Sequence, residues 1–365
     1  MTALSIRPLL GVRRLTRHWA RHRGLGLLVL RRLLLVPVVL WALVTVVFVA
    51  MRMVGSSPAA ALGAAGANGL SSAQVAQNIA RIRKSLGLDL PLRVQYVHYL
   101  DQLLHLDLGT SYTSGNSVRG LLGAALPVTI ELTVAAMGIA VIIGVLTGLI
   151  AAATKGSMLD AAIRGLATVS FSLPWFALGV LGIVVFGVEL HWLPVLGRMP
   201  NTLGYVPTTN FVLLDAILQD RPDLVLPWLQ HLVLPATTLA LSMCGFITRT
   251  VRASVLEVLG DDFTRTARMK GLSEPQILRR HVLRNSSLPI VTVLGLQFGA
   301  LLGGSVITEQ VFSYPGVGSL LIAGVQQQDY PVVQGGVLAI ATLFVLVNLI
   351  VDVLYLVLDP RLRKA

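Results

Sequence analysis

The sequence predicts an all-α protein that crosses a membrane six times, with both chain ends on the cytoplasmic side. Of its 365 residues, 55% are hydrophobic and only 13% are charged, whereas soluble domains carry about 25% charged residues. Such a chain has too little polar surface to cover itself in water, which favours a bilayer as its solvent. Six apolar stretches and an unequal distribution of basic residues between them complete the prediction.

The apolar stretches place the spans. The first runs from Leu33 to Met51 without a charge, close to the roughly 20 residues that a spanning helix needs. The other five lie at about 128–154, 166–188, 232–248, 289–308 and 332–358. The fourth of these six is the shortest and the last contains an Asp, so both are weaker than the rest.

The basic residues set the orientation. With the N-terminus inside, the segments predicted to be cytoplasmic hold 21 of the 29 Lys and Arg residues, and the segment between the last two spans holds none. Positive residues stay on the cytoplasmic side, so we expect the N-in and C-in arrangement. The net charge of +12 does not indicate nucleic acid, because the charges are divided between spans instead of forming one basic face.

The predicted organisation has five parts: an Arg-rich cytoplasmic extension over 1–30, the first span over 31–54, an external amphipathic segment over 55–127, spans two to six over 128–358, and a cytoplasmic tail over 359–365. The Arg residues of the extension would be attracted to anionic lipid. The start of the chain also has features of a secretory signal, but its apolar run exceeds the usual 7–15 residues, which favours a retained anchor.

Two amphipathic helices are expected in the external segment. The first begins at Ser71 or Ser72 and ends at Gly87. The second has Pro91 in its first turn, and its apolar stripe is Val94, Val97, Leu100 and Leu104. Both helices could lie on the outer membrane surface. The Pro-rich residues 189–230 are expected to form an irregular loop.

A polar stretch at 261–289 interrupts the apolar spans. Asp261 or Asp262 can cap a short helix over 263–270, and Gly271 can end it in a left-handed conformation. A capping-box pattern, Ser273 with Gln276, then opens a second helix.

Asn285 and Pro289 mark a predicted turn into the fifth span. The short helix would lie crosswise at the cytoplasmic surface, with Phe263 and Ala267 on one face and a basic rim around it. Its residues alone leave two interpretations open, a docking surface for another protein and an amphipathic helix resting on lipid headgroups.

The stretch "RTARMKGLSEPQILRRHVLRNSSLP" resembles the EAA-type loop of ABC importer permeases, and more closely that of the dipeptide/oligopeptide/nickel permease family. Arg265, Thr266 and Ala267 take the E-A-A places, and Gly271 takes the place of the Gly. Further matches occur in the same order along the chain: "LGLDLPLRVQY" at 86–96, "DLGTSY" at 107–112, "LPVTIELT" at 126–133, "EQVFSYPGVGSLL" at 309–321 and "DYPVVQG" at 329–335.

The resemblance implies a type I ABC importer permease fold in a bacterial cytoplasmic (inner) membrane, with the cytoplasmic coupling loop at 250–288. It implies that a sister permease subunit completes a pathway for peptides or similar small solutes, and that an extracytoplasmic substrate-binding protein delivers them. Two ATP-binding cassette ATPases, which bind ATP and Mg²⁺, would grip the short helix. The residues that carry this coupling role are Phe263, Arg265, Thr266, Ala267, Arg268, Met269, Lys270 and Gly271.

No enzymatic chemistry of its own is expected. The sequence has no G-x-x-x-x-G-K-[ST] and no H-E-x-x-H pattern, so we expect no catalytic residue, no metal and no cofactor in this chain. Two other functions remain to be weighed, an ion-gradient-driven secondary transporter and a structural membrane anchor. The first would predict broken helices at mid-membrane and paired repeats, and the sequence shows neither pattern.

Polar residues inside spans are functional candidates. Glu131, Gln297, Asn348 and Asp352 either join helices or line the pathway. Glu309 and Tyr314, near the predicted outer mouth, form a gate or an ordinary Pro-Gly turn.

Two sets of glycines recur at four-residue spacing, Gly144 with Gly148, and Gly295 with Gly299 and Gly303. Small residues let membrane helices approach closely. These glycines can serve packing within one subunit or an interface between two.

Overall fold

A computed structural model describes residues 34–53, 59–60 and 71–358, and within these residues the chain is helical without a named strand. The predicted extension over 1–30 and tail over 359–365 lie outside the described residues. Five helices are long and apolar enough to span a membrane: Leu34–Met53, Val118–Ala153, Pro222–Gly260, Glu274–Val311 and Tyr330–Leu354. A bent pair, Met158–Ser172 with Trp175–Glu189, supplies the sixth span if its two helices count as one.

The elements follow one another in a simple order. In chain order they are the first helix over 34–53, α3 (Ser72–Ser85), α4 (Leu92–Leu104), α5 (Val118–Ala153), α6 (Met158–Ser172), α7 (Trp175–Gly182) with η1 (Ile183–Glu189), η2 (Asn201–Leu203), α8 (Val212–Leu218), η3 (Pro222–Leu224), α9 (Val225–Gly260), α10 (Asp262–Met269), α11 (Glu274–Ile277), η4 (Leu278–Val282), α12 (Leu283–Val311), α13 (Val317–Gln326) and α14 (Tyr330–Leu358).

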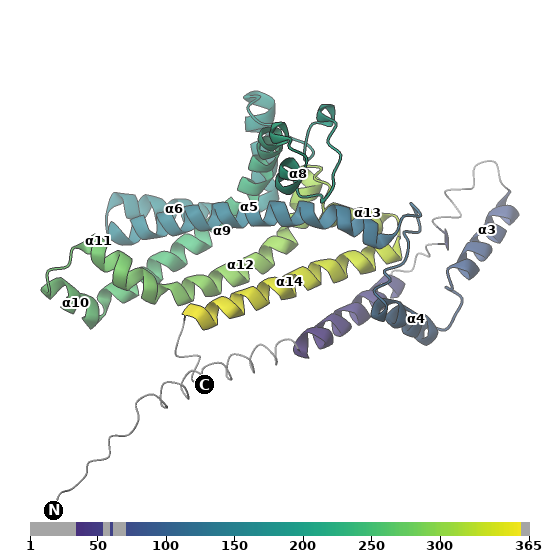
Figure 1. Cartoon of the computed structure of the whole chain (residues 1–365), viewed down its shortest axis with the longest axis horizontal. Helices are drawn as coiled ribbons and strands as arrows, with labels where there is room; N and C mark the ends of the chain where they lie inside the picture. Colours follow the sequence, from purple (N-terminus) through teal and green to yellow (C-terminus); the bar gives the residue numbers. More distant parts are fainter. Residues whose placement is uncertain (1–33, 54–58, 61–70, 359–365) are drawn as a thin grey trace, which may run out of the picture.

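The long helices run together along the long axis of the molecule (Figure 1). Helices α10 and α11 lie at one end of this bundle, and α4 and α13 lie toward the other. The short polar helix and the external segment therefore sit at opposite ends, as they must if one is cytoplasmic and the other is not.

The core of the bundle is the contact between α5 and α9. Gly144 and Gly148 allow it, because a Cβ on Gly144 would lie 2.7 Å from the Cβ of Ile247, and one on Gly148 would lie 2.9 Å from the carbonyl oxygen of Thr248. Such close approach lets dispersion contacts hold helices together in lipid, where no hydrophobic drive exists between them. These two glycines therefore serve packing within the chain.

The second glycine set serves the same purpose in part. A Cβ on Gly295 would meet Val351 at 2.7 Å, and one on Gly299 would meet the ring of Phe344 at 2.4 Å, so both bring α12 onto α14. Gly303 has no neighbour within 4 Å of such a Cβ among the described residues. The intrachain interpretation thus holds for the first two positions of this set.

The third predicted span, 166–188, is not one straight helix. α6 and α7 meet at an angle of 98°, and Leu173 between them is extended, with φ −87° and ψ 134°. Pro174 causes this break, because a proline ring disfavours the helical conformation of the residue before it. Figure 1 shows the chain after the bend rising away from the long helices toward α8.

The predicted turn at Asn285 and Pro289 is wrong. α11, η4 and α12 form one continuous helical stretch from Glu274 to Val311, with Pro289 inside it. A proline removes one backbone donor from a helix, but neighbouring helices can satisfy the freed carbonyl in a membrane protein. The short segment α10 therefore connects directly, through one turn, to a spanning helix.

The two helices predicted within residues 55–127 form, but the packed face of α4 differs from the prediction. α3 begins after a capping box of Ser71 with Gln74, and Gly87 has φ +65°. On α4, Val97 is 64% exposed, whereas Tyr96 and Tyr99 pack on Phe48 of the first helix with ring centroids 5.0 and 5.8 Å away. Aromatic pairing outweighs the aliphatic stripe that the spacing predicted.

Candidate functional site

The polar stretch at 261–289 forms a short helix that projects from the end of the bundle. α10 spans Asp262–Met269 with Asp261 at its N-cap, and Gly271 follows it with φ +82°. Only glycine adopts this left-handed region without strain, which allows the chain to reverse into α11. The predicted capping box is present, and the Ser273 N–H donates to Gln276 Oε1 at 3.1 Å.

One face of α10 is fixed to the bundle. Thr264 is fully buried, and its Oγ1 lies 2.9 Å from the carbonyl oxygen of Leu259 and 2.6 Å from that of Asp261. Ala267, one turn further, is 7% exposed and joins the core that α9 dominates. The anchoring face therefore consists of Thr264 and Ala267, and Phe263 does not share it.

The other face of α10 is open. Phe263 is 40% exposed and Met269 is 80% exposed. The remaining exposed residues from the predicted coupling set are Arg265, Thr266, Arg268, Lys270 and Gly271. Arg268 reaches across the turn to Glu274, with Nε 2.7 Å from Oε1, and this ion pair raises the pKa of the Arg268 guanidinium.

The base of α9 is tied to α6 by a buried ion pair. Arg252 donates from Nε and Nη2 to the two carboxylate oxygens of Asp160, both at 2.8 Å. Asp160 is 1% exposed. This two-pronged arrangement is rigid as well as strong, so α9 and the start of α6 move together near the end that carries α10.

Glu131 joins three parts of the chain. Its carboxylate lies 2.5 Å from Arg198 Nη2, 2.7 Å from the Val212 backbone nitrogen and 3.2 Å from Trp228 Nε1. Glu131 and Arg198 are each 8% exposed at the side chain. These contacts fasten the segment between η1 and α9 to α5, which favours the helix-joining interpretation for Glu131.

The segment joined by Glu131 has a second buried carboxylate. Asp215 of α8 accepts hydrogen bonds from Tyr205 Oη at 2.6 Å and from the backbone and side chain of Thr209. Burial opposes ionisation of Asp215, but its hydrogen bonds outweigh burial and lower its pKa. The expected irregular loop at 189–230 therefore contains an ordered helix closed by this carboxylate.

Glu309 is fully buried and caps α13. Its Oε1 accepts from Thr129 Oγ1 at 2.7 Å, and its Oε2 accepts from the backbone nitrogens of Gly318 at 2.7 Å and Ser319 at 3.1 Å. A Cβ on Gly316 would lie 2.4 Å from this carboxylate. The glycines around Pro315 therefore admit the carboxylate to the start of the helix, where an anion is stabilised.

Tyr314 is also fully buried. Its hydroxyl has no hydrogen-bond partner among the described residues, and its backbone nitrogen donates to the Glu309 carbonyl oxygen at 2.7 Å. The structure thus places Glu309 in the last turn of α12 and Tyr314 in the turn between α12 and α13.

Gln297 lines a cavity of about 410 Å³ between α6, α7, α9 and α12. Trp175, at the start of α7, lines the same cavity, and its Nε1 is buried without a partner among the described residues. Phe171, Ser242 and Gly304 contribute to the walls. The bend after α6 opens this space beside the spanning helices.

The structure does not bring the last two candidates into this cavity. Asn348 donates to the Phe344 carbonyl oxygen of its own helix at 3.0 Å. Asp352 lies one turn further along α14 and is half-buried. Within the described residues, no group of three His, Cys, Asp or Glu side chains could hold a metal ion.

Comparison with known proteins identifies the family. Residues 144–364 match the model of the binding-protein-dependent transport system inner membrane component, and residues 26–133 match that of its N-terminal part. The first match alone covers more than half of the chain. The chain belongs to this permease family.

Individual relatives narrow the family to the dipeptide/oligopeptide branch of ABC importer permeases. The chain is 40% identical over 338 residues to the dipeptide transport system permease protein DppB of Escherichia coli K12, covering 92% of this chain and 98% of that relative. It is 43% identical over 278 residues to the di/tripeptide transport system permease protein DppB of Pseudomonas aeruginosa, covering 76% and 83%.

A solved structure matches the fold. The inward-facing MetNI methionine ABC transporter superposes with a TM-score of 0.51 at 17% identity, covering 66% of this chain and 96% of that chain. The predicted type I importer permease fold is thereby confirmed. A permease subunit of this family with several spanning helices is a multi-pass protein of the bacterial inner membrane.

Sequence reasoning missed the residues that fix the permease helices to one another. Thr264, Arg198 and the pair of Asp160 with Arg252 were not among the candidates. Arg198 lies 67 positions from Glu131, so its partner cannot be found from spacing. Thr264 could have been found from local spacing, because it lies three residues before Ala267 and therefore on the same face of the helix.

Proposed function

We propose that this permease subunit imports short peptides, driven by ATP hydrolysis on ATPase subunits that grip α10. The observation that carries the proposal is the division of α10 into a buried face and an open one. Thr264 and Ala267 hold the helix to α9, while Phe263 and Met269 present apolar surface outward. A partner that binds the open face therefore pushes on a part of the bundle, not on a loose loop.

The peptide class is supported by the relatives, two of which are named for dipeptide and di/tripeptide transport. A sister permease subunit would complete the pathway, and an extracytoplasmic substrate-binding protein would deliver the peptide. Two ATPase subunits would bind ATP and Mg²⁺. The chain itself would hydrolyse nothing and hold no cofactor.

The coupling would be mechanical. α10 joins α9 at one end and continues through α11 into α12 at the other, so movement of α10 displaces both helices. Shifting a two-state bundle from 1:99 to 99:1 requires about 5.5 kcal/mol of differential binding. ATPase closure on α10 supplies that difference only if the ATPases bind one bundle state better than the other.

The cavity beside Gln297 is the part of the pathway that this chain would contribute. Its walls come from α6, α7, α9 and α12, and the last two of these helices are the ones that α10 moves. A peptide backbone in this cavity would accept hydrogen bonds from the amide of Gln297 and from Trp175 Nε1, which has no partner among the described residues. Glu131, Glu309 and Tyr314 would instead hold the framework around it.

Reconstituted vesicles test the proposal. The chain is purified with its co-purifying subunits, and uptake of a labelled dipeptide is measured with ATP inside, and again with an ionophore that dissipates ion gradients. We expect ATP-dependent uptake that the ionophore leaves unchanged. The bend between α6 and α7 is a broken span of the kind a secondary transporter uses, so uptake abolished by the ionophore and indifferent to ATP would favour that function instead.

A further inference from the structure

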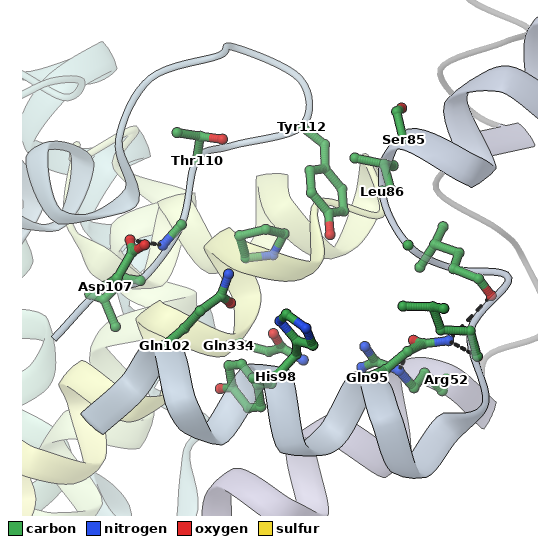
Figure 2. A pocket seen from close by; sticks show the side chains of 17 residues that line it. Arg52, Ser85, Leu86, Gln95, His98, Gln102, Asp107, Thr110, Tyr112 and Gln334 are labelled. Atoms are coloured by element: carbon green, nitrogen blue, oxygen red, sulfur yellow. Dashed lines mark hydrogen bonds between the residues drawn. The ribbon is translucent and has the colours of Figure 1, made fainter. Parts of the chain in front are cut away.

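A second cavity lies at the end of the bundle opposite α10. It has a volume of about 370 Å³, within the range of small-molecule sites. Its walls include residues from three stretches that carry the family resemblance, 86–96, 107–112 and 329–335. α4 and Arg52 of the first helix also contribute. Figure 2 shows these side chains pointing toward a common space.

Arg52 brings a cation to one side of the cavity. Its Nε donates to Gln95 Oε1 at 3.0 Å and its Nη1 donates to the Phe48 carbonyl oxygen at 3.3 Å. The guanidinium also lies 3.4 Å from the centroid of the Phe48 ring. Among the described residues it forms no ion pair with a carboxylate, so the charge of this half-buried cation is not neutralised there.

Gln334 supplies an unused donor to the same cavity. Its side chain is 7% exposed, and its Nε2 has no hydrogen-bond partner among the described residues. Buried donors are nearly always paired, so this amide lacks an acceptor that a bound molecule would provide. Burial raises the pKa of Tyr99 to about 12 and also raises that of Tyr112, so both phenols stay protonated and able to donate.

Asp107 places an opposite charge across the cavity from Arg52. One of its oxygens accepts from the Gly109 backbone nitrogen at 2.9 Å. In Figure 2 the two labelled residues stand on opposite sides of the space, with Gln102, His98 and Gln334 between them. A cavity with a cation at one side, an anion at the other and neutral polar groups between them is complementary to a zwitterion.

We propose that this cavity binds a short zwitterionic peptide, with its carboxylate at Arg52 and Gln334 and its ammonium group toward Asp107. The cavity is separate from the one beside Gln297, since the two share no lining residue. Binding here would hold a peptide at the outer end of the permease before it enters the pathway. The inference rests on the proposed function for the choice of a peptide as ligand.

Binding to the full-length chain in lipid nanodiscs, together with the subunits that co-purify with it, tests this inference. The probe is dialanine, measured by calorimetry without nucleotide and without a binding protein. Its two analogues each lack one charge: the C-terminal amide lacks the carboxylate, and the N-acetyl form lacks the ammonium. We expect each analogue to bind at least tenfold more weakly, because each loses a charge-assisted hydrogen bond.

Variants assign each charge to a residue. Arg52→Gln should weaken dialanine binding at least tenfold and should abolish the preference for dialanine over its amide. Arg52→Lys should restore part of the dialanine affinity. Asp107→Asn should abolish the preference for dialanine over its N-acetyl form. Arg83→Gln and Asp101→Asn change exposed charges that do not line the cavity and should leave all affinities unchanged.

Three results would overturn the inference: equal affinity for dialanine and its amide, unchanged affinity in Arg52→Gln, or acetate binding as tightly as dialanine. The last would mean that the cavity takes a lone carboxylate, such as an acidic side chain of a docked protein. ATP-dependent uptake is measured on the same preparations. Intact uptake with no dialanine bound at this cavity contradicts the inference alone and leaves the proposed function standing.

Discussion

Single buried carboxylates hold the permease together, and Glu309 shows how. It accepts hydrogen bonds from three donors on two other segments, Thr129, Gly318 and Ser319. A carboxylate has acceptors on both oxygens, whereas an amide turns one of them into a donor. An amide of the same size at position 309 would therefore not replace the acceptors that the carboxylate supplies.

We predict that Glu309→Gln lowers stability by about 1–3 kcal/mol, because its NH₂ faces a donor where the carboxylate accepted. Thermal unfolding in detergent measures this loss. Glu257→Gln, at an exposed position on α9, is the matched control and should unfold like the parent protein. An unchanged unfolding temperature in Glu309→Gln would contradict the capping role.

Asp215 makes the stability of the segment between η1 and α9 depend on pH. Its folded pKa lies below the usual value of about 3.9, so its contribution is fully present above that value and is lost as the pH falls through the folded pKa. Asp215→Asn should unfold at a lower temperature than the parent at pH 7, and the difference should shrink as the pH approaches 3. Asp220→Asn, in the exposed turn after α8, is the control and should unfold like the parent protein at pH 7.

At the scale of elements, close helix contact depends on a few positions without side chains. A Cβ on Gly148 would lie 2.7 Å from Val251 and 2.9 Å from the Thr248 carbonyl oxygen, whereas one on Gly138 of the same helix meets nothing within 4 Å. Gly148 and Gly138 lie on the same helix, so they differ only in how closely other residues approach them.

We predict that Gly148→Ala destabilises the protein by about 1–3 kcal/mol, because backbone cannot move aside as a side chain can. Gly138→Ala should be neutral or should stabilise by up to about 1 kcal/mol, since alanine is the better helix former. Thermal unfolding of both variants gives the comparison. Equal effects at the two positions would show that α5 does not depend on this contact.

The sequence predicted elements that local rules decide. The capping box at Ser273, the left-handed Gly271 and a serine cap at Ser71 or Ser72 were predicted from neighbouring residues, and the structure contains them, with Ser71 as the cap. Hydropathy placed the spans because the bilayer excludes unpaired backbone groups. The bend at Pro174 was missed because the apolar run continues through it.

What the sequence could not provide is the set of partners for each polar residue. Glu131 was a candidate both for joining helices and for lining the pathway, and its contacts with Arg198, Val212 and Trp228 favour the joining role. The packed face of α4 was likewise decided by Phe48 of another helix. Such long-range pairs leave no trace in local spacing.

At the scale of the whole molecule, we propose a different role for each end of the bundle. One end carries α10, and the other carries the polar cavity with Arg52 (Figure 1). The long helices between them provide the rigid connection, tied at the α10 end by Arg252 with Asp160. In the proposed mechanism, a partner bound to the open face of α10 would transmit its movement along these helices.

The most direct test of this account is ATP-dependent dipeptide uptake by vesicles containing Phe263→Asp, which places a charge on the apolar part of the open face of α10. Val206→Asp, a change at a 73% exposed position outside α10, is the control. We predict that Phe263→Asp loses at least nine-tenths of uptake and no longer retains the ATPase on purification, while it unfolds at the parent temperature and Val206→Asp transports normally. Uptake at the parent rate in Phe263→Asp, with its ATPase still bound, would contradict the account.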